Sequence, residues 1–329
     1  PKLKDAFFRS LEHAANIPLP TTTGMDTLAC MEAARRGDVR FALCLGGNLY
    51  GSNPDSAFAT EAFGCIDQVV HLSTTLNTGH ALGRGRETII LPVLPRDEEP
   101  QPTTQESMFN YVRLSDGGRP RHEGPRSEVE VITELASRVL GQQGAFDWES
   151  LRSHEAIRDL IARVVPGYAA IGDIGRSREE FQIDGRTFHA PRFATSSGRA
   201  CVHDVPLPRP EPLADDELRL MTIRSEGQFN TVVYEEEDLY RGQDRRDVIL
   251  MHEEDRLRFG LEHDELVEVS TGTGSMEVRV RCIDIRPGNA VMYYPEANVL
   301  IPRRVDPESR TPAFKGIPLR IRRRSAVEA

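Results

Sequence analysis

The stretch from Met221 to Thr231 (MTIRSEGQFNT) concentrates side chains that could bind a nucleotide-like ligand. It begins with the pattern of a strand and then brings together one guanidinium, two carboxamides, two hydroxyls and a glycine. A guanidinium can pair with two phosphate oxygens, and carboxamides can bond to the edges of a purine or a pterin. The segment therefore predicts a binding loop, with an ordinary polar loop as the alternative. Its candidate contacts are Arg224, Ser225, Gly227, Gln228, Phe229, Asn230 and Thr231.

A glycine turn follows the apolar run 39–45 (VRFALCL), which is typical of a buried strand. Gly46, Gly47 and Asn48 come next, ahead of a predicted helix. Glycines at a strand-to-helix turn let backbone amides approach a phosphate, and the helix dipole favours the negative charge. The turn lacks a full GxGxxG pattern and a phosphate-binding lysine, so a simple tight turn is the alternative.

The next predicted strand, 68–73 (QVVHLS), ends in small hydroxyl side chains. Parallel sheets bind ligands at the carboxyl ends of their strands, so Ser73, Thr74 and Thr75 are candidate contacts. His71 lies inside the strand, where a histidine is more often packed than catalytic, and we keep it as a candidate contact. His80 is expected to be a loop residue without a partner.

The elements that would position these residues fall into two regions. Helical and strand patterns alternate in the first region, which predicts an α/β layer with parallel strands. We expect a long loop over 95–124, a turn inside a hairpin at 196–199, and a linker over 205–212 (VPLPRPEP). After it, short alternating strands and glycine turns predict an all-β sandwich or barrel. The predicted helices cover 26–36, 55–63, 127–140, about 155–165 and about 253–259; the predicted strands cover 39–45, 68–73, 87–94, 218–223, 248–251, 265–270, 276–283 and 290–294.

Composition excludes several classes of protein. The net charge of -10 argues against general binding of nucleic acid or anionic membranes, which needs a basic footprint. The apolar runs are far shorter than the roughly 20 residues of a membrane span. Five scattered cysteines form no CxxC, so we expect reduced thiols in a cytoplasmic protein and no zinc or iron–sulfur site. No GxSxG hydrolase motif is present. The chain starts at Pro1 without a methionine, and we expect it to be a fragment of a longer polypeptide.

The stretch from Met221 to Thr231 resembles the start of the C-terminal molybdopterin-dinucleotide-binding domain of the dimethyl-sulfoxide-reductase superfamily. Three later segments resemble the same domain in order: 252–269 (HEEDRLRFGLEHDELVEV), 292–302 (MYYPEANVLIP) and 311–321 (TPAFKGIPLRI). In front of them, 43–48, 68–75 and 88–92 are similar to the family's guanosine-holding α/β domain, and 188–202 to the segment that leads to the last domain. Within the superfamily, the chain is most similar to the formate-dehydrogenase-alpha-like branch.

This resemblance implies a fold and a set of contacts. The fold would be an α/β domain with a mostly parallel sheet over 1–204, a linker over 205–216, and an all-β, six-stranded, double-psi-like barrel over 217–329. The ligand would be molybdopterin guanine dinucleotide (bis-MGD) with molybdenum or tungsten. Arg224 would pair with its pyrophosphate, the turn at 46–48 would present amides, and Asn298 and Lys315 would reach the pterin.

The resemblance also implies what the chain lacks. Family members carry their iron–sulfur cysteines and metal ligand in a front half that this sequence does not contain. We therefore assign no catalytic residue and no metal ligand, expect any 4Fe-4S cluster only in the missing N-terminal half, and expect that half as the partner. The chain would be inactive alone, and its substrate and electron partner stay open. One alternative is a non-catalytic cofactor-binding or scaffold fragment. Another is a barrel of the aspartate-decarboxylase or AAA-ATPase N-domain kind, which lacks the preceding α/β domain.

Overall fold

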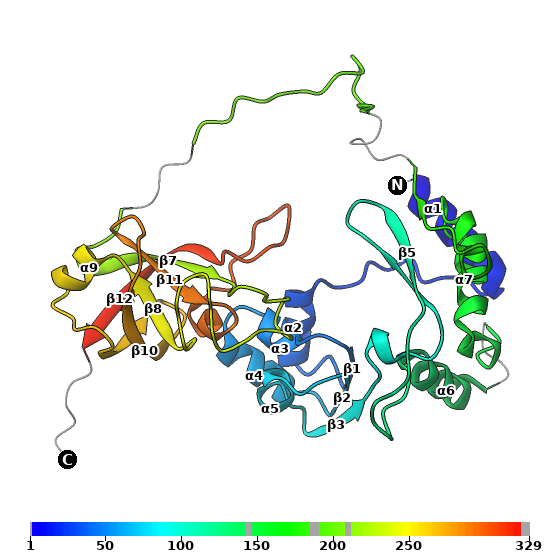
Figure 1. The fold of residues 1–329 in the computed structure, drawn as a ribbon, viewed down its shortest axis with the longest axis horizontal. Helices are drawn as coiled ribbons and strands as arrows, with labels where there is room; N and C mark the ends of the chain where they lie inside the picture. The colour runs from blue at the N-terminus through cyan, green and yellow to red at the C-terminus, as the bar shows by residue number, and fades with distance from the viewer. Residues whose placement is uncertain (1, 142–145, 185–190, 208–211, 324–329) are drawn as a thin grey trace. The chain divides into compact units, whose positions relative to one another are not determined.

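The computed structural model describes residues 2–141, 146–184, 191–207 and 212–323 (Figure 1). The chain forms two compact units. Unit 1 consists of Pro1–Thr23 and Leu91–Pro206, and unit 2 consists of Gly24–Ile90 and Leu207–Ala329. The predicted domain boundaries, with a linker over 205–216, stay a prediction. Residues 208–211 of that linker and 188–190 of the predicted lead-in segment lie outside the described residues.

The α/β part of unit 2 contains a three-stranded sheet in the order β1-β2-β3. β1 and β2 are parallel, as predicted, with Phe41 opposite Gln68 and Leu45 opposite Leu72. The predicted helices 26–36 and 55–63 are observed as α2 and α4, while the short helices α3 and α5 were not predicted. The elements are β1 (Phe41–Leu45), β2 (Gln68–Ser73), β3 (Glu87–Pro92), α2 (Thr27–Arg35), α3 (Leu49–Ser52), α4 (Ser56–Gly64) and α5 (Thr78–Leu82).

Helices α2 and α4 cover one face of this sheet, where Phe63 and Val69 are fully buried. Within the described part of unit 2 no helix covers the other face, where Leu72 of β2 is buried but Phe41, Leu43 and Leu45 of β1 are 52%, 39% and 51% exposed. The prediction of a buried strand over 39–45 is thus wrong for that face. The apolar run is typical of parallel strands that are covered on both faces, and the described residues supply only one cover.

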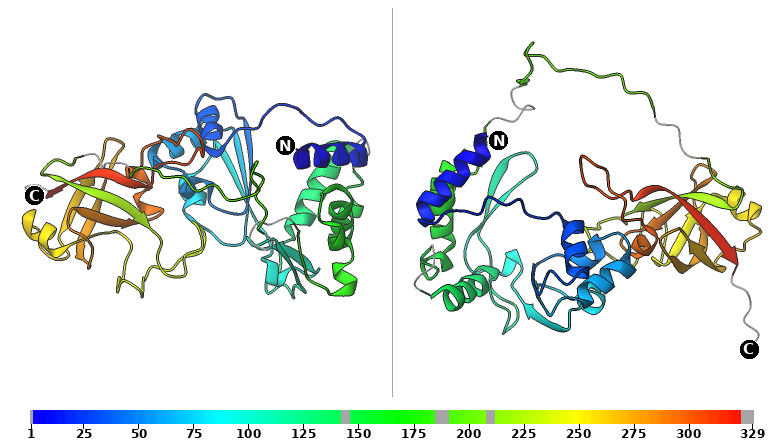
Figure 2. Two further views of the ribbon diagram at one scale, coloured as in Figure 1. Left: turned by 90° about the horizontal axis from the view of Figure 1, so that it is seen from above. Right: turned by 180° about the vertical axis from the view of Figure 1, so that it is seen from behind.

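The barrel of unit 2 is closed and six-stranded, in the order β10-β8-β11-β7-β12-β9. Both views of Figure 2 show its strands around a common interior, which Leu218, Leu220, Met292 and their neighbours fill. The pairs β7–β11 and β8–β10 are parallel, and the others are antiparallel. The six-stranded, double-psi-like barrel is therefore confirmed. Its elements are β7 (Glu217–Ile223), β8 (Val248–Met251), α9 (Glu253–Arg258), β9 (Leu266–Ser270), β10 (Ser275–Cys282), β11 (Asn289–Tyr293), η5 (Glu296–Leu300) and β12 (Lys315–Arg323).

Unit 1 contains an antiparallel sheet in the order β4-β5-β6 and four α-helices within its described residues. The prediction of a long loop over 95–124 is wrong, because β4 and β5 form a hairpin there. Its polar composition hid the pattern: only Val112 and Leu114 point into the core around Ile174. The elements are α1 (Lys2–Ala15), η1 (Arg96–Glu98), β4 (Thr103–Glu106), β5 (Tyr111–Ser115), α6 (Glu128–Leu140), η3 (Ser150–Arg152), α7 (His154–Val164), η4 (Ala169–Gly172), α8 (Ile174–Ser177) and β6 (Phe181–Gln182).

Two smaller predictions concern unit 1. The turn at 196–199 is confirmed, with the Gly198 amide donating to the Thr195 carbonyl. No strand flanks it within 191–207, so the predicted hairpin is not found in the described part; 185–190 lie outside it. The helix α1 was not predicted. None of the helices in the described ranges is long and apolar enough to cross a membrane.

Candidate functional site

A cavity of about 460 Å³ opens at one end of the barrel and carries three cationic side chains. We call it the cationic cavity; it is lined by Thr222, Ile223, Arg224, Arg241, Tyr294, Phe314 and Lys315. Strand register explains how residues far apart in sequence meet. Lys315, the first residue of β12, pairs with Met221 of the antiparallel strand β7, so Lys315 and Arg224 lie at the same end of the barrel. Two predicted contacts therefore share one cavity.

The aromatic rings of the cationic cavity form one wall. Tyr294 and Phe314 make an edge-to-face pair with ring centroids 5.7 Å apart. The Arg224 guanidinium lies over the Tyr294 ring at 5.9 Å, and its Nη2 donates to Asn230 Oδ1 at 2.8 Å. Burial raises the pKa of the Tyr294 phenol, which the charge of Arg224 partly offsets. An aromatic wall beside fixed cations suits a ligand with both a flat ring and negative charge.

Arg241 is the cation of this cavity that the sequence analysis missed. Its Nη1 donates to Asp238 Oδ2 at 2.6 Å and to the Arg224 carbonyl at 3.3 Å. Asp238 is buried and also accepts from the Tyr293 hydroxyl at 2.8 Å. Burial alone would raise the pKa of Asp238, but the hydrogen bonds from Arg241 and Tyr293 outweigh it and lower that pKa. Asp238 is therefore stabilised as a carboxylate, and this carboxylate holds the Arg241 side chain in place. In the sequence, Asp238 ends the acidic run 235–238 (EEED), in which nothing marks it as a buried residue.

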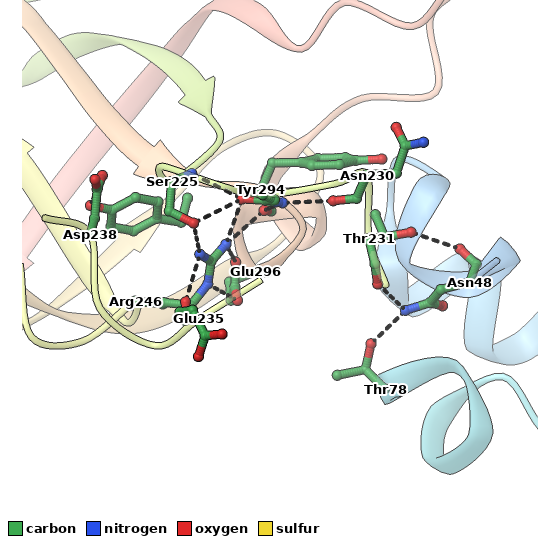
Figure 3. Close-up of polar contacts among 12 residues, drawn as sticks. Asn48, Thr78, Ser225, Asn230, Thr231, Glu235, Asp238, Arg246, Tyr294 and Glu296 are labelled. Atoms are coloured by element: carbon green, nitrogen blue, oxygen red, sulfur yellow. Dashed lines mark hydrogen bonds and ion pairs between the residues drawn. The ribbon is translucent and has the colours of Figure 1, made fainter. Parts of the chain in front are cut away.

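Arg246 holds the loop 225–228 in place through hydrogen bonds and an ion pair (Figure 3). Its side chain is 3% exposed and bridges Glu296 at 2.7 Å, Ser225 Oγ at 2.8 Å and the Tyr294 carbonyl at 2.8 Å. It also lies between the rings of Tyr234 and Tyr293, at 4.3 and 4.8 Å from their centroids. Nothing in the run GQDRRD marks this arginine in the sequence. It positions the loop and has no surface to offer a ligand.

Several side chains that the sequence predicts as ligand contacts form hydrogen bonds with other groups of the protein. Gln228 Nε2 donates to the carbonyls of Asn230 and Tyr294, while its Oε1 accepts from the Ser225 amide and from Arg246. Ser225 is buried, whereas Phe229 is 72% exposed. Gly227 and Asn230 adopt positive φ angles of 68° and 52°, as a tight loop requires. Of the predicted loop, Arg224 therefore remains the charged group that faces the cavity.

Asn48 and Thr231 connect the α/β part to the barrel (Figure 3). Asn48 Nδ2 donates to Thr78 Oγ1 at 2.9 Å and to the Thr231 carbonyl at 3.2 Å, and Thr231 Oγ1 donates to the Asn48 carbonyl. Asn48 Oδ1 accepts from the Gly51 amide. Asn298, which is fully buried, donates to the carbonyls of Gly51 and Asn53, both at 2.8 Å. These three side chains hold unit 2 together.

The structure brings the glycine turn and the hydroxyl loop to one edge of the sheet, as the parallel strands predict. Gly46 and Gly47 have φ angles of 62° and 68°, and the Gly46 amide donates to the Leu72 carbonyl. Ser73 is buried and its Oγ donates to the Thr75 carbonyl, while Thr74 and Thr75 are exposed. Whether these residues contact a ligand stays a prediction.

His71 lies away from that edge, on the covered side of the sheet. Its ring meets the His80 ring edge-to-face, with centroids 4.9 Å apart, and both residues are buried. Burial lowers the pKa of both imidazoles. The prediction that His80 is a loop residue without a partner is wrong: His80 belongs to α5 and accepts from the Asn77 amide at 2.9 Å.

A protein metal site is not found among the described residues, where no three His, Cys, Asp or Glu side chains could hold an ion. All five cysteines lie in described segments and are free thiols.

Comparisons with known proteins bear on this site. Residues 218–318 match the family described as "Molydopterin dinucleotide binding domain". An uncharacterized oxidoreductase of Mycobacterium tuberculosis is 33% identical over 340 residues, which cover 97% of this chain and 43% of that protein. Protein YdeP of Escherichia coli is 29% identical over 322 residues, covering 92% of this chain and 42% of its own length.

Among solved structures, acetylene hydratase from Pelobacter acetylenicus superimposes with a TM-score of 0.68 at 15% identity. The match covers 98% of this chain and 50% of that enzyme, and it supports the fold. The chain spans less than half the length of the two curated relatives. The predicted resemblance to the molybdopterin-dinucleotide-binding domain is confirmed.

Proposed function

We propose that this chain, whose residues 218–318 match the family described as "Molydopterin dinucleotide binding domain", is the cofactor-holding part of a larger molybdenum or tungsten oxidoreductase. The observation that carries the proposal is the meeting of Arg224, Arg241 and Lys315 beside two aromatic rings in one cavity of about 460 Å³. Its chemistry fits the pyrophosphate and flat ring system of a dinucleotide cofactor such as molybdopterin guanine dinucleotide.

The donors divide the work of binding. Arg224 is held by Asn230 and presents its remaining N–H groups to phosphate oxygens, which guanidinium geometry can bind in pairs. Arg241 is oriented by buried Asp238, and Lys315 adds a mobile point charge. When bound, the cofactor would supply the two-electron chemistry, while these residues bind and orient it.

The bare face of the β1-β2-β3 sheet supports the proposal that further polypeptide completes the enzyme. Phe41, Leu43 and Leu45 leave apolar surface exposed on a sheet with parallel strands, a type that is nearly always covered on both faces. The curated relatives are more than twice as long as the part that this chain matches. We propose that the partner of this chain is an N-terminal region of the same polypeptide, which carries the metal ligand and any 4Fe-4S cluster. A formate-dehydrogenase-like reaction and a cytoplasmic location belong to the same proposal.

Cofactor content tests this function. The polypeptide that contains this chain is produced in a molybdenum-replete host, and its pterin is measured by fluorescence after acid extraction, together with its metal. Losing one charge-assisted contact of about 1.5–3 kcal/mol weakens binding roughly 10- to 100-fold, so Arg224→Ala combined with Lys315→Met should lower the pterin content sharply.

The control is Arg322→Ala, which removes an exposed cation of β12 outside the cationic cavity. It should leave pterin and metal content unchanged. Equal pterin content in the double variant and the wild type would overturn the proposed site. A wild-type protein that contains no pterin would overturn the function itself.

A further inference from the structure

Asn77 lies where two predicted ligand-binding segments of the α/β part meet, the turn 46–48 and the residues 73–75. Its Nδ2 donates to the Gly47 carbonyl at 3.2 Å, which ties it to the turn after β1. Its Oδ1 accepts from the Gly79 amide at 2.9 Å, so it also caps α5. Shortly before it in the chain, Ser73 ends β2, and Thr74 and Thr75 follow in the loop. One side chain therefore holds both segments at the carboxyl edge of the sheet.

His80 holds Asn77 in place through a capping box. The Asn77 amide donates to His80 Nδ1 at 2.9 Å, in the position where a Glu or Gln side chain commonly accepts. Nδ1 can accept only while it carries no proton. The cap therefore requires the neutral imidazole, unlike a cap made by Gln, which accepts at every pH.

The surroundings of His80 favour that neutral state. His80 is 7% exposed, and burial lowers the pKa of its imidazole. The ring of His71 faces it from β2, and His71 Nε2 has no hydrogen-bond partner among the described residues. Arg84 and Arg86 line the same cavity of about 670 Å³ as His80, and Arg86 pairs with Asp67 at 3.0 Å. The two arginines are cations, and the lining of this cavity contains no carboxylate that would offset a positive charge on His80.

Asn48, Asn77 and Gly79 pack closely together, which leaves them little freedom to rearrange. A methyl group on Gly79 would lie 2.5 Å from Asn48 Oδ1 and 3.0 Å from Asn77 Oδ1. Asn48 in turn donates to Thr78 Oγ1, the first residue of α5. Movement of α5 is thereby transmitted to the turn that contains Gly46 and Gly47.

We propose that Asn77 and His80 are positioning residues, which align the turn 46–48 with the loop 73–75 for the cofactor and release both segments when His80 takes up a proton. The cofactor part of this inference rests on the proposed function. The coupling of His80 to Asn77 is a property of the ligand-free chain and is tested separately.

Amide hydrogen exchange of the ligand-free chain tests the coupling. The protection of the Asn77 and Gly79 amides, corrected for intrinsic rates, is measured between about pH 7.5 and about pH 4.5. In the wild type, protection of Asn77 should fall about tenfold toward acid pH, since one hydrogen bond of about 1.4 kcal/mol is lost. His80→Gln should keep the protection at every pH, and His80→Ala should show the low value throughout.

Pterin retention over the same pH range tests the positioning role. The wild type should lose pterin on acidification, and His80→Gln should retain it. Asn77→Ser keeps a good helix cap but cannot reach the Gly47 carbonyl. It should therefore lower pterin retention at every pH while the Gly79 amide stays protected.

The outcomes separate the two proposals. Protection of Asn77 that stays unchanged in His80→Ala, or a wild-type pH profile in His80→Gln, would overturn the coupling. If the wild type holds no pterin at any pH while the exchange profile follows the expectation, the proposed function fails and the coupling stands. If Asn77→Ser retains pterin like the wild type, the positioning role is refuted.

Discussion

Replacing Arg246 with alanine should destabilise the barrel of unit 2 far more than it changes any charge at the surface. The guanidinium is 3% exposed and holds Ser225, Tyr294 and Glu296 by bonds of 2.7 to 2.8 Å. Its removal leaves a carbonyl, a hydroxyl and a carboxylate without their shared donor. Breaking a buried pair on one side costs about 3–5 kcal/mol. Since Glu296 is 28% exposed and can regain water, we expect the lower end, about 3 kcal/mol.

Urea unfolding provides the assay. With a slope of about 2 kcal/mol per molar urea, a loss of about 3 kcal/mol lowers the midpoint by about 1.5 M. Far-UV circular dichroism reports on the secondary structure of both units, so its transition includes the barrel strands. The fluorescence of Trp148, the single tryptophan of the chain, reports on unit 1. The dichroism transition should shift while the fluorescence transition stays in place.

Arg245→Ala is the matched control, because Arg245 is the neighbouring residue and pairs with Asp247 while 38% exposed. A surface pair of this kind contributes about 0–1 kcal/mol, so its midpoint should barely move. The double variant Arg246→Met with Glu296→Gln removes both charges and should recover part of the lost stability. Equal midpoints for Arg245→Ala and Arg246→Ala would refute the view that Arg246 organises the loop.

Three further predictions follow from packing, titration and exposure. Gly79→Ala should lower the free energy of unfolding by about 1–3 kcal/mol, because its methyl group would lie 2.5 Å from Asn48 Oδ1. The control Gly64→Ala, with open space around the added methyl group, should leave the urea midpoint unchanged. Burial lowers the pKa of His71 and His80 in the folded state, so the unfolded chain binds more protons than the folded chain below about pH 6.5. The free energy of unfolding should therefore be retained above that pH and fall on acidification. His80→Gln should make the fall of the urea midpoint with pH less steep. Leu43→Ser, on the exposed sheet face, should leave the free energy of unfolding within about 1 kcal/mol of the wild type but reduce the binding of a hydrophobic dye. Unchanged dye fluorescence would argue that another surface binds the dye.

The strands and helices with strong periodicity were predictable, because their burial follows local pattern. The run 265–270 alternates, and the buried side chains of β9, Val267 and Val269, are those that the alternation selects. The hairpin β4–β5 escaped prediction because its strands, TTQE and YVRLS, place few side chains in a core. Helix α5 was hidden for another reason: the third residue of the helix, which completes its capping box, is a histidine, His80, where a Glu or Gln is the usual signal.

The site residues divide along similar lines. Arg224 and Lys315 could be named from the resemblance, because both belong to segments with recognisable order along the chain. Arg241 and Arg246 could not. Arg241 owes its place to Asp238, a near neighbour whose burial the sequence does not reveal, and Arg246 owes its place to Glu296 and Tyr294, which lie far along the chain. Charge runs in a sequence do not reveal which of their members are buried.

The topology of the barrel explains why its cations converge. β7 and β11 are parallel neighbours, so the residues that follow them, Arg224 and Tyr294, emerge at the same end. β12 is antiparallel to β7, so its first residue, Lys315, starts at that end. The polar loop 225–231 must cross this end of the barrel, and the Gln228 carboxamide satisfies its backbone at Ser225 and Asn230. The polar side chains of the loop thus bond within the protein, whereas Arg224 lines the cationic cavity with Arg241 and Lys315, where we propose that the cofactor binds.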